Sequence, residues 1–393
     1  MKQPCANRLA HEHPLGSCCP ARQWALFPRA QDSGRAVIGM DSSKVRIARM
    51  VGRVARAALL WRATRNVFLQ HASIVFYHGV WPRETAAQRM FGGVTLDQFE
   101  SDLRLLRERF DVVDLAGMLA DHRGVASKRP RLALTFDDGF DLTRGGATEI
   151  LAHYRMPATM FVNSASVNYH DLMWQHKLCA IRATRGDELF VRELNAVLVK
   201  TGVPPIARAG DQGAATRLWP AARKDEYAEA VWRGSSMPPA NQILRDHRPY
   251  FDWDGLRSWI ARGHSVGFHT HSHPFCSRLG ANEVSHELIE PVKQLRAELG
   301  VSTVPFAYPF GDRLPPALEA DVIGSNVFSC LLGTGRLSPR YEHAAALDRV
   351  DAEAGLDAEL YGWPLVRRFK RLVFRRSKET PRQNDAESDG REC

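Results

Sequence analysis

Short apolar runs alternate with amphipathic segments along the central part of the chain. Runs that end in a polar or glycine-containing turn predict buried strands at 73–77, 111–115, 131–136, 158–162, 265–268, 304–308 and 327–331. Apolar residues at helical spacing predict helices at about 97–110, 143–154, 254–263 and 284–299. Strands that alternate with helices indicate a parallel β/α architecture.

The alternation lapses between residues 164 and 250. This stretch has helical spacing around Trp174, Leu178 and Ile181, followed by connections rich in Gly, Pro and Ala. It contains no motif that we associate with a site. We therefore interpret 164–250 as a helical insertion in an α/β domain.

The domain that carries this pattern spans residues 72–350. With 44% hydrophobic and 25% charged residues, the chain has the composition of a globular protein. Residues 1–39 mix Pro, Gly, Ser, Cys and His without periodicity, and we expect them to be disordered. Residues 40–71 form a basic amphipathic segment, and residues 351–393 form a basic segment with a polar tail.

The net charge of +9 is concentrated near the two ends. Segments 42–70 and 366–378 each contain seven Lys or Arg residues and no acid, so the remainder of the chain is mildly acidic. A mildly acidic body argues against a nucleic-acid partner, which needs clustered positive charge. Both basic segments also contain apolar residues, which suits contact with an anionic membrane surface. The alternative is that their apolar faces pack on the domain.

The sequence lacks two features, a transmembrane segment and a regular cysteine pattern, and both bear on the cellular compartment of the protein. The sequence has no run of about 18 apolar residues, so it predicts no transmembrane helix. Its cysteines form no C-x-x-C pair and have no regular spacing, which favours a reducing environment. We expect a cytoplasmic protein with peripheral contact at the inner face of the membrane.

The predicted strands share polar residues at their carboxyl ends. His78, the pair Asp137 and Asp138, His269, and the turn 308–311 each follow an apolar run. In parallel β/α barrels the functional groups gather at this end of the strands. These residues therefore predict one site.

Two of the motifs at this end, the carboxylate pair and the histidine cluster, suit a metal. Asp137 and Asp138 would repel each other if buried, unless a cation or a proton lies between them; the alternative is a solvated turn. His269 and His273 can meet at one metal if the backbone turns helically, with His271 directed elsewhere; the alternative is a polar loop. Two histidines and Asp138 would leave coordination positions open, as a catalytic metal requires.

Together the motifs resemble those of a known family. T-F-D-D-G-F at 135–140, H-T-H-S-H-P at 269–274 and Y-P-F-G at 308–311 are similar to motifs of the polysaccharide deacetylases of the NodB-homology family, the family-four carbohydrate esterases. The resemblance covers about 73–163 and 251–350. It implies a distorted (β/α) barrel and metal-dependent removal of acetyl groups from N-acetylated sugars. It further implies that Asp138, His269 and His273 are the metal ligands, with Zn²⁺ as the expected metal, and that Asp137 is the catalytic base.

The third motif departs from the family pattern R-x-P-Y. Ala307 stands where the family has Arg, and Phe310 stands where it has Tyr. The oxyanion role that the resemblance implies belongs to the backbone N–H at Phe310, so it survives the change. The arginine that usually orients the base is missing, which leaves the tuning of Asp137 open.

The general acid is also at an unusual place. The family's late L-x-H motif is absent, but V-F-Y-H at 75–78 resembles the opening strand of permuted members. His78 is therefore the candidate general acid, and His343 is the second choice.

These features predict a hydrolase that removes N-acetyl groups from a glycan or polysaccharide precursor, free or lipid-linked, in cell-surface polysaccharide biosynthesis. One alternative is an O-deacetylase or another carbon–nitrogen amide hydrolase on the same scaffold. The other is a non-catalytic sugar-binding module, which the missing arginine would favour.

Overall fold

The computed structural model describes residues 73–83, 85–120, 129–169, 171–334, 346–353 and 355–356. Four of the expectations fall outside these ranges. They are the disordered segment 1–39, the basic segment 40–71, nearly all of the segment 351–393, and His343 as a second-choice acid.

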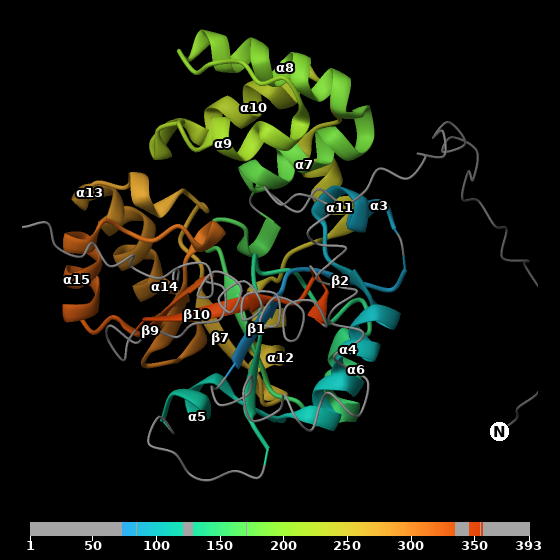
Figure 1. Cartoon of the computed structure of the whole chain (residues 1–393), viewed down its shortest axis with the longest axis vertical. Coiled ribbons are helices and arrows are strands. Elements are labelled where there is room, and N and C mark those ends of the chain that lie inside the picture. Colours follow the sequence, from blue (N-terminus) through green and yellow to red (C-terminus); the bar gives the residue numbers. More distant parts are fainter. Residues whose placement is uncertain are drawn as a thin grey trace, which may run out of the picture. The chain divides into compact units, whose positions relative to one another are not determined.

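Parallel strands form a closed barrel, coloured from blue at β1 to red at β10 in Figure 1. The order around the barrel is β1, β10, β9, β8, β7, β6 and β5, and it closes because β1 pairs with both β10 and β5. Strand β4 pairs with the first residues of β5 beside this ring. The bounds are β1 (Ser73–Tyr77), β4 (Asp111–Val113), β5 (Arg131–Phe136), β6 (Ala158–Val162), β7 (Ser265–Phe268), β8 (Val304–Ala307), β9 (Phe328–Thr334) and β10 (Ala346–Asp351). The prediction of a distorted (β/α) barrel is confirmed.

The predicted strands agree closely with the observed ones. Strands β1, β5, β6 and β7 have the predicted bounds, whereas β4 and β8 end earlier and β9 is shifted toward its carboxyl end. The pattern did not predict β10, nor the two-stranded parallel pair β2 (Val80–Trp81) and β3 (Val94–Thr95).

Helices cover the outside of the barrel (Figure 1). Helix α4 begins after Thr95, whose side chain accepts a hydrogen bond from the Gln98 N–H, and it buries Phe99, Leu103 and Leu106. The elements are α3 (Ala86–Phe91), α4 (Leu96–Arg109), α5 (Leu115–Ala120), α6 (Ala147–Tyr154), α12 (Trp253–Ala261), α13 (Ala281–Val284), α14 (Glu290–Leu299) and α15 (Pro316–Gly324).

Two predicted helices differ from the observed ones. The helix predicted from residue 143 begins only at Ala147, because the Asp141 side chain accepts the Thr143 N–H in a turn before it. The helix predicted over 284–299 is divided by a π-helical turn, Ser285–Ile289.

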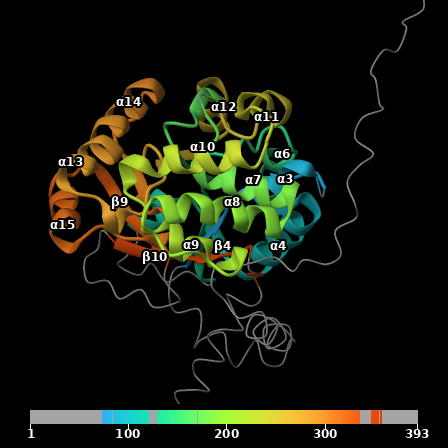
Figure 2. The same cartoon turned by 90° about the horizontal axis from the view of Figure 1, so that it is seen from above.

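The insertion forms a separate helical layer at one end of the barrel (Figure 1). Seen from above, α8 and α10 cross over the strands (Figure 2). The helices bury an apolar cluster that includes Phe190, Leu194, Val231 and Trp232 and extends to Phe91 on α3. Their bounds are α7 (Trp174–Arg185), α8 (Asp187–Lys200), α9 (Gln212–Thr216), α10 (Lys224–Gly234) and α11 (Ala240–His247).

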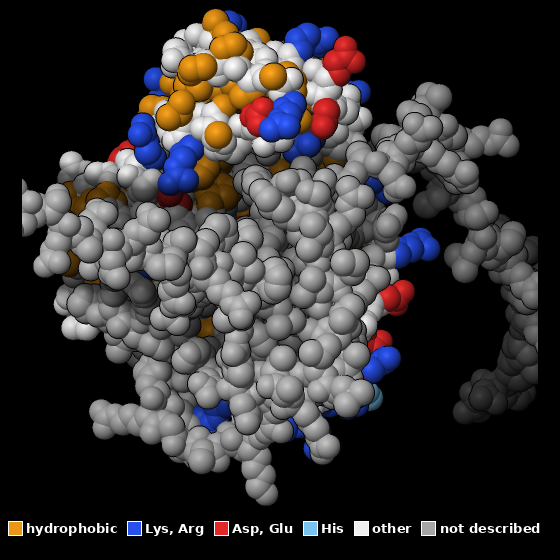
Figure 3. Space-filling view, in the orientation of Figure 1, with side chains coloured by type: hydrophobic (Ala, Val, Ile, Leu, Met, Phe, Trp, Pro, Cys, Tyr) orange, Lys and Arg blue, Asp and Glu red, His pale blue; other side chains and the backbone are white. Residues whose placement is uncertain are grey.

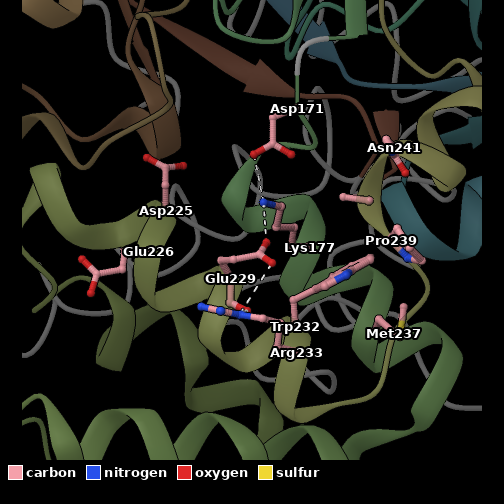
Figure 4. A pocket seen from close by; sticks show the side chains of 11 residues that line it. Asp171, Lys177, Asp225, Glu226, Glu229, Trp232, Arg233, Met237, Pro239 and Asn241 are labelled. Atoms are coloured by element: carbon pink, nitrogen blue, oxygen red, sulfur yellow. Dashed lines mark hydrogen bonds and ion pairs between the residues drawn. The ribbon is translucent and has the colours of Figure 1, made fainter.

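The surface of the insertion mixes apolar side chains with charges of both signs (Figure 3). A cavity of about 690 Å³ opens between α7, α10 and α11. In it the Lys177 ammonium lies 2.9 Å from carboxylate oxygens of both Asp171 and Glu229 (Figure 4). The cavity contains none of the predicted site residues. Within the described ranges, no helix has the length and hydropathy needed to cross a membrane.

Candidate metal centre and catalytic residues

Three of the predicted site residues converge on one point. Asp138 follows β5, and His269 and His273 follow β7; one ligand atom from each lies within 4.8 Å of the others. Asp138 Oδ1 lies 3.2 Å from His273 Nε2 and 3.6 Å from His269 Nε2. This buried oxygen accepts no hydrogen bond from the described residues. An orphaned carboxylate oxygen that faces two imidazole nitrogens fits a bound cation.

The protonation of His269 suits a ligand. Its Nδ1 lies 2.7 Å from the carbonyl oxygen of Ala307, which can only accept, so Nδ1 carries the proton and Nε2 keeps a lone pair that is available to a cation near Asp138 Oδ1. Burial lowers the pKa of His269 to about 4, which keeps the ring neutral. Ala307, which replaces the expected arginine, therefore contributes its backbone to the site.

The histidine motif is not helical. Thr270 (φ 71°) and His273 (φ 59°) have left-handed backbone conformations, and so does Asp138 (φ 67°) in the preceding motif. The prediction that His269 and His273 meet through a helical turn is therefore wrong, although they do meet. Left-handed residues other than glycine are costly and concentrate at functional sites.

His271 lies apart from the three converging side chains. It is exposed, and its Nδ1 is 2.9 Å from Ser164 Oγ. Its backbone N–H donates to the Glu287 carbonyl (2.8 Å), and the next N–H, that of Ser272, donates to Glu287 Oε2 (2.9 Å). Glu287 in the π-helical turn thus holds the loop between the two inward-facing histidines.

Asp137 is held by an arginine that the sequence analysis did not find. Arg349 Nη1 and Nη2 donate to its two carboxylate oxygens at 2.6 and 2.7 Å, and both side chains are buried. The missing family arginine at 307 is thus replaced by one on β10. Burial alone would raise the pKa of Asp137, but Arg349 holds it below its ordinary value.

Arg349 lies inside the barrel. Its guanidinium carbon is 4.7 Å from the ring centre of Phe76 on β1 and 5.2 Å from that of Phe161 on β6. Because β6 is not a neighbour of β10, the side chain reaches Phe161 through the interior. Gly267 leaves room for the Phe161 ring, since a Cβ there would lie 2.4 Å from it. Stacked rings and the bidentate pair offset the cost of burying the charge.

His78 follows β1 and pairs with Glu353. Its Nδ1 lies 3.4 Å from Glu353 Oε2, and its backbone N–H donates to Glu353 Oε1 at 2.6 Å. Burial would lower the pKa of His78, but Glu353, aided by Asp138 and Asp137, raises it to about 10. About one third of the side chain (33%) remains exposed, so the ring has access to solvent.

Phe310 borders the candidate ligand His273 and lies in a short 3₁₀ turn, Pro309–Gly311, with a left-handed φ of 57°. Its ring centre is 4.6 Å from that of His273 and 4.4 Å from that of Phe275, on which it stacks. The side chain is 38% exposed, unlike the other rings beside the site.

The insertion also reaches the site, contrary to the expectation that it carries none of it. The Trp174 Nε1–H donates to the His273 carbonyl at 2.9 Å. His176 Nε2 lies 3.2 Å from Asp138 Oδ2. Trp174 and His176 are single residues in a helix whose pattern is that of a buried helix. They form no motif, so the sequence did not indicate that they belong to the site.

Solved structures with a similar fold include a Streptococcus pyogenes deacetylase, PplD, in complex with acetate (14% identity, TM-score 0.45), which covers 73% of this chain and 97% of its own. IcaB from Ammonifex degensii has 16% identity and a TM-score of 0.46, covering 74% and 97%. The BpsB deacetylase domain from Bordetella bronchiseptica has 14% identity and a TM-score of 0.39, covering 71% and 93%. No curated protein matches the sequence.

A family model gives the stronger comparison. Residues 124–321 match the model described as polysaccharide deacetylase. This range contains both carboxylates, the histidine motif, the Phe310 turn and the insertion, and it amounts to just over half of the 393 residues. The chain therefore belongs to the polysaccharide deacetylase family.

Proposed function

We propose that the protein is a metal-dependent hydrolase that removes N-acetyl groups from a glycan or polysaccharide precursor. The observation that carries this proposal is the buried group of Asp138, His269 and His273 beside the arginine-bound carboxylate of Asp137. Two imidazoles and one carboxylate are a donor set that Zn²⁺ accepts, with positions left for water and substrate. A divalent ion held there would polarise the acetyl carbonyl and lower the pKa of its water toward about 7.

Asp137 is the proposed base. The depressed pKa keeps it ionised at neutral pH, and a carboxylate retains free lone pairs when each oxygen accepts one hydrogen bond from Arg349. The fixed guanidinium prevents the carboxylate from rotating. Arg349 thus makes Asp137 a weaker but better aligned proton acceptor.

His78 is the proposed acid. With its pKa raised to about 10 beside Glu353, it is protonated at neutral pH and can donate to the leaving nitrogen. An amide requires this proton because an unprotonated amine is a poor leaving group. The backbone N–H of Phe310 would stabilise the oxyanion, a contribution worth about 3 kcal/mol for one such donor.

The exposed Phe310 ring supports a carbohydrate substrate. A pyranose has an apolar face of C–H groups that packs on aromatic rings, and the Phe310–Phe275 stack is next to His273.

The proposal also includes lipid linkage of the glycan and a cytoplasmic location at the membrane surface. They rest on the basic segments 40–71 and 366–378. Co-sedimentation with anionic vesicles that is lost in neutral vesicles or at high salt would support them.

The decisive experiment measures acetate release from an N-acetylglucosamine oligomer and from an O-acetylated sugar. Protein treated with a chelator should be inactive and should recover with Zn²⁺. Asp138→Ala, His269→Ala and His273→Ala should each lose metal, whereas the matched control His271→Ala should keep it. Full metal occupancy in His273→Ala would refute the ligand assignment. Acetate from the O-acetylated sugar alone would favour an O-deacetylase, and bound metal without hydrolysis would favour a sugar-binding module.

A further inference from the structure

We infer that the helical insertion holds the metal ligands in place, and that His176 is a positioning residue for Asp138. The inference rests on the metal centre of the proposed function and is independent of which glycan is the substrate. Helix α7 begins at Trp174, so both side chains of the insertion that touch the ligands lie in its first turn.

The two carboxylate oxygens of Asp138 have different partners. Oδ1 faces His269 and His273, and Oδ2 lies 3.2 Å from His176 Nε2. A hydrogen bond to Oδ2 fixes the rotation of the carboxylate about its last bond. Asp138 would therefore offer Oδ1 to a metal, with Oδ2 engaged by His176.

A hydrogen-bond chain fixes the ring of His176. The carboxylate can only accept, so His176 Nε2 carries the proton, and Nδ1 accepts from the Tyr250 hydroxyl at 2.6 Å. Tyr250 in turn accepts the Met173 N–H at 3.3 Å. Burial lowers the pKa of His176, which agrees with a neutral ring. This is the arrangement that outer groups adopt around a metal site.

Packing leaves the His176 ring little freedom. Its side chain is buried, and its ring centre lies 5.0 Å from that of Phe140, 5.6 Å from Phe91 and 5.8 Å from Tyr250. Phe140 belongs to the motif that contains Asp138. The ring is therefore held by α3, by the loop after β5 and by the far end of the insertion.

The second contact fixes a ligand through its backbone. The Trp174 Nε1–H donates to the carbonyl of His273, the residue with φ 59°. A hydrogen bond from a buried indole helps to hold the peptide in this costly conformation.

The far end of the insertion returns to the same loop. The Asp141 N–H donates to the Pro249 carbonyl at 2.8 Å, and the Phe251 N–H donates to the Gly139 carbonyl at 2.9 Å. Entry and exit of the insertion thus both contact the loop that carries Asp138. Loss of these contacts should weaken metal binding even though no ligand is altered.

The test measures the dissociation constant of Zn²⁺ by competition with a chromophoric chelator, and the rise in Tm on adding Zn²⁺, in the full chain. His176→Phe keeps a ring and removes the hydrogen bond; it should weaken binding about 10- to 100-fold, as for other outer groups of metal sites. Tyr250→Phe should have a smaller effect in the same direction. His176→Gln, which restores an N–H near Nε2, should recover part of the affinity.

The control is His264→Phe. His264 is also a buried histidine, stacked on Trp259 with ring centres 4.0 Å apart. This variant should bind Zn²⁺ as tightly as the unaltered protein, whatever its effect on stability. Equal Zn²⁺ affinity in folded His176→Phe and unaltered protein would overturn the inference and leave the metal centre standing. Failure of the unaltered protein to bind Zn²⁺ would remove both.

Discussion

Two strands, β5 and β7, contribute to the candidate site in a different way from helix α7 and strand β10. Strands β5 and β7 end in the candidate reacting groups Asp137, Asp138 and His269, which the sequence motifs predict. Helix α7 and strand β10 supply His176 and Arg349, which hold two of those groups and which no motif predicts. The candidate reacting groups lie in short motifs directly after strands, whereas the supporting groups come from elements that pack nearby and carry no motif.

The largest effect should come from a group that acts. Asp137→Asn is nearly isosteric and should retain metal, but it removes the proton acceptor. We expect kcat to fall about 10²- to 10⁴-fold. Acetate release and metal content, measured on the same preparation, check this. Near-normal turnover would remove Asp137 from the mechanism.

Substitution of Arg349 tests how much a supporting group contributes, compared with the proposed base Asp137 that it holds. Arg349→Met leaves Asp137 buried without a partner, and breaking such a pair costs about 3–5 kcal/mol of stability. The depressed pKa of Asp137 gives stability that is present above the unfolded pKa and lost as pH falls through the folded pKa. The Tm difference from the unaltered protein should therefore shrink in acid.

The activity of Arg349 variants makes this test sharper. Without the guanidinium the pKa of Asp137 rises, so the acid limb of kcat/KM should move to higher pH in Arg349→Met. Arg349→Lys keeps the charge but not the bidentate geometry, and it should recover the pH profile better than the rate. An unchanged acid limb in Arg349→Met would show that Arg349 does not tune the base.

Phe310→Ala separates the backbone role of this residue from its side chain. Loss of the exposed ring removes an aromatic contact worth about 0.5–1.5 kcal/mol, so KM for an oligosaccharide should rise about 2- to 10-fold. The backbone N–H remains, so kcat should change little. A fall in kcat with constant KM would contradict the stacking role.

Glu353→Gln should have the smallest effect at neutral pH. The raised pKa of His78 gives stability that is present below the unfolded pKa and lost as pH rises through about 10. Removing the carboxylate lowers that pKa, so the basic limb of kcat/KM should move to lower pH. Amide substrates should respond more than activated esters. Identical pH profiles would count against His78 as the acid.

Strand β10 shows why part of the fold escaped prediction. Its sequence A-L-D-R-V-D mixes apolar and charged residues without a regular alternation and contains no continuous apolar run, so it gives no strand signal. Arg349 is nevertheless buried, because Asp137 and two aromatic rings lie opposite it in the closed barrel. A partner more than two hundred residues away leaves no trace in local periodicity.

The motifs predicted which groups converge but not how they do so. The runs 131–136 and 265–268 coincide with strands β5 and β7, so these strands and the residues after them follow from local pattern. The left-handed backbone at Asp138 and His273 depends on contacts such as that of Trp174, which only tertiary structure provides.

Closure of the barrel by β1 against β10 has a consequence for the order of synthesis. The ribosome produces His78 first among these groups, and Arg349 and Glu353 last. A nascent chain that stops before residue 346 already contains Asp137 and the three proposed ligands. It lacks both the guanidinium that pairs with Asp137 and the carboxylate that contributes most to the raised pKa of His78. The surroundings of the proposed acid and the proposed base are therefore completed in one step, when β10 and the residues directly after it join the barrel.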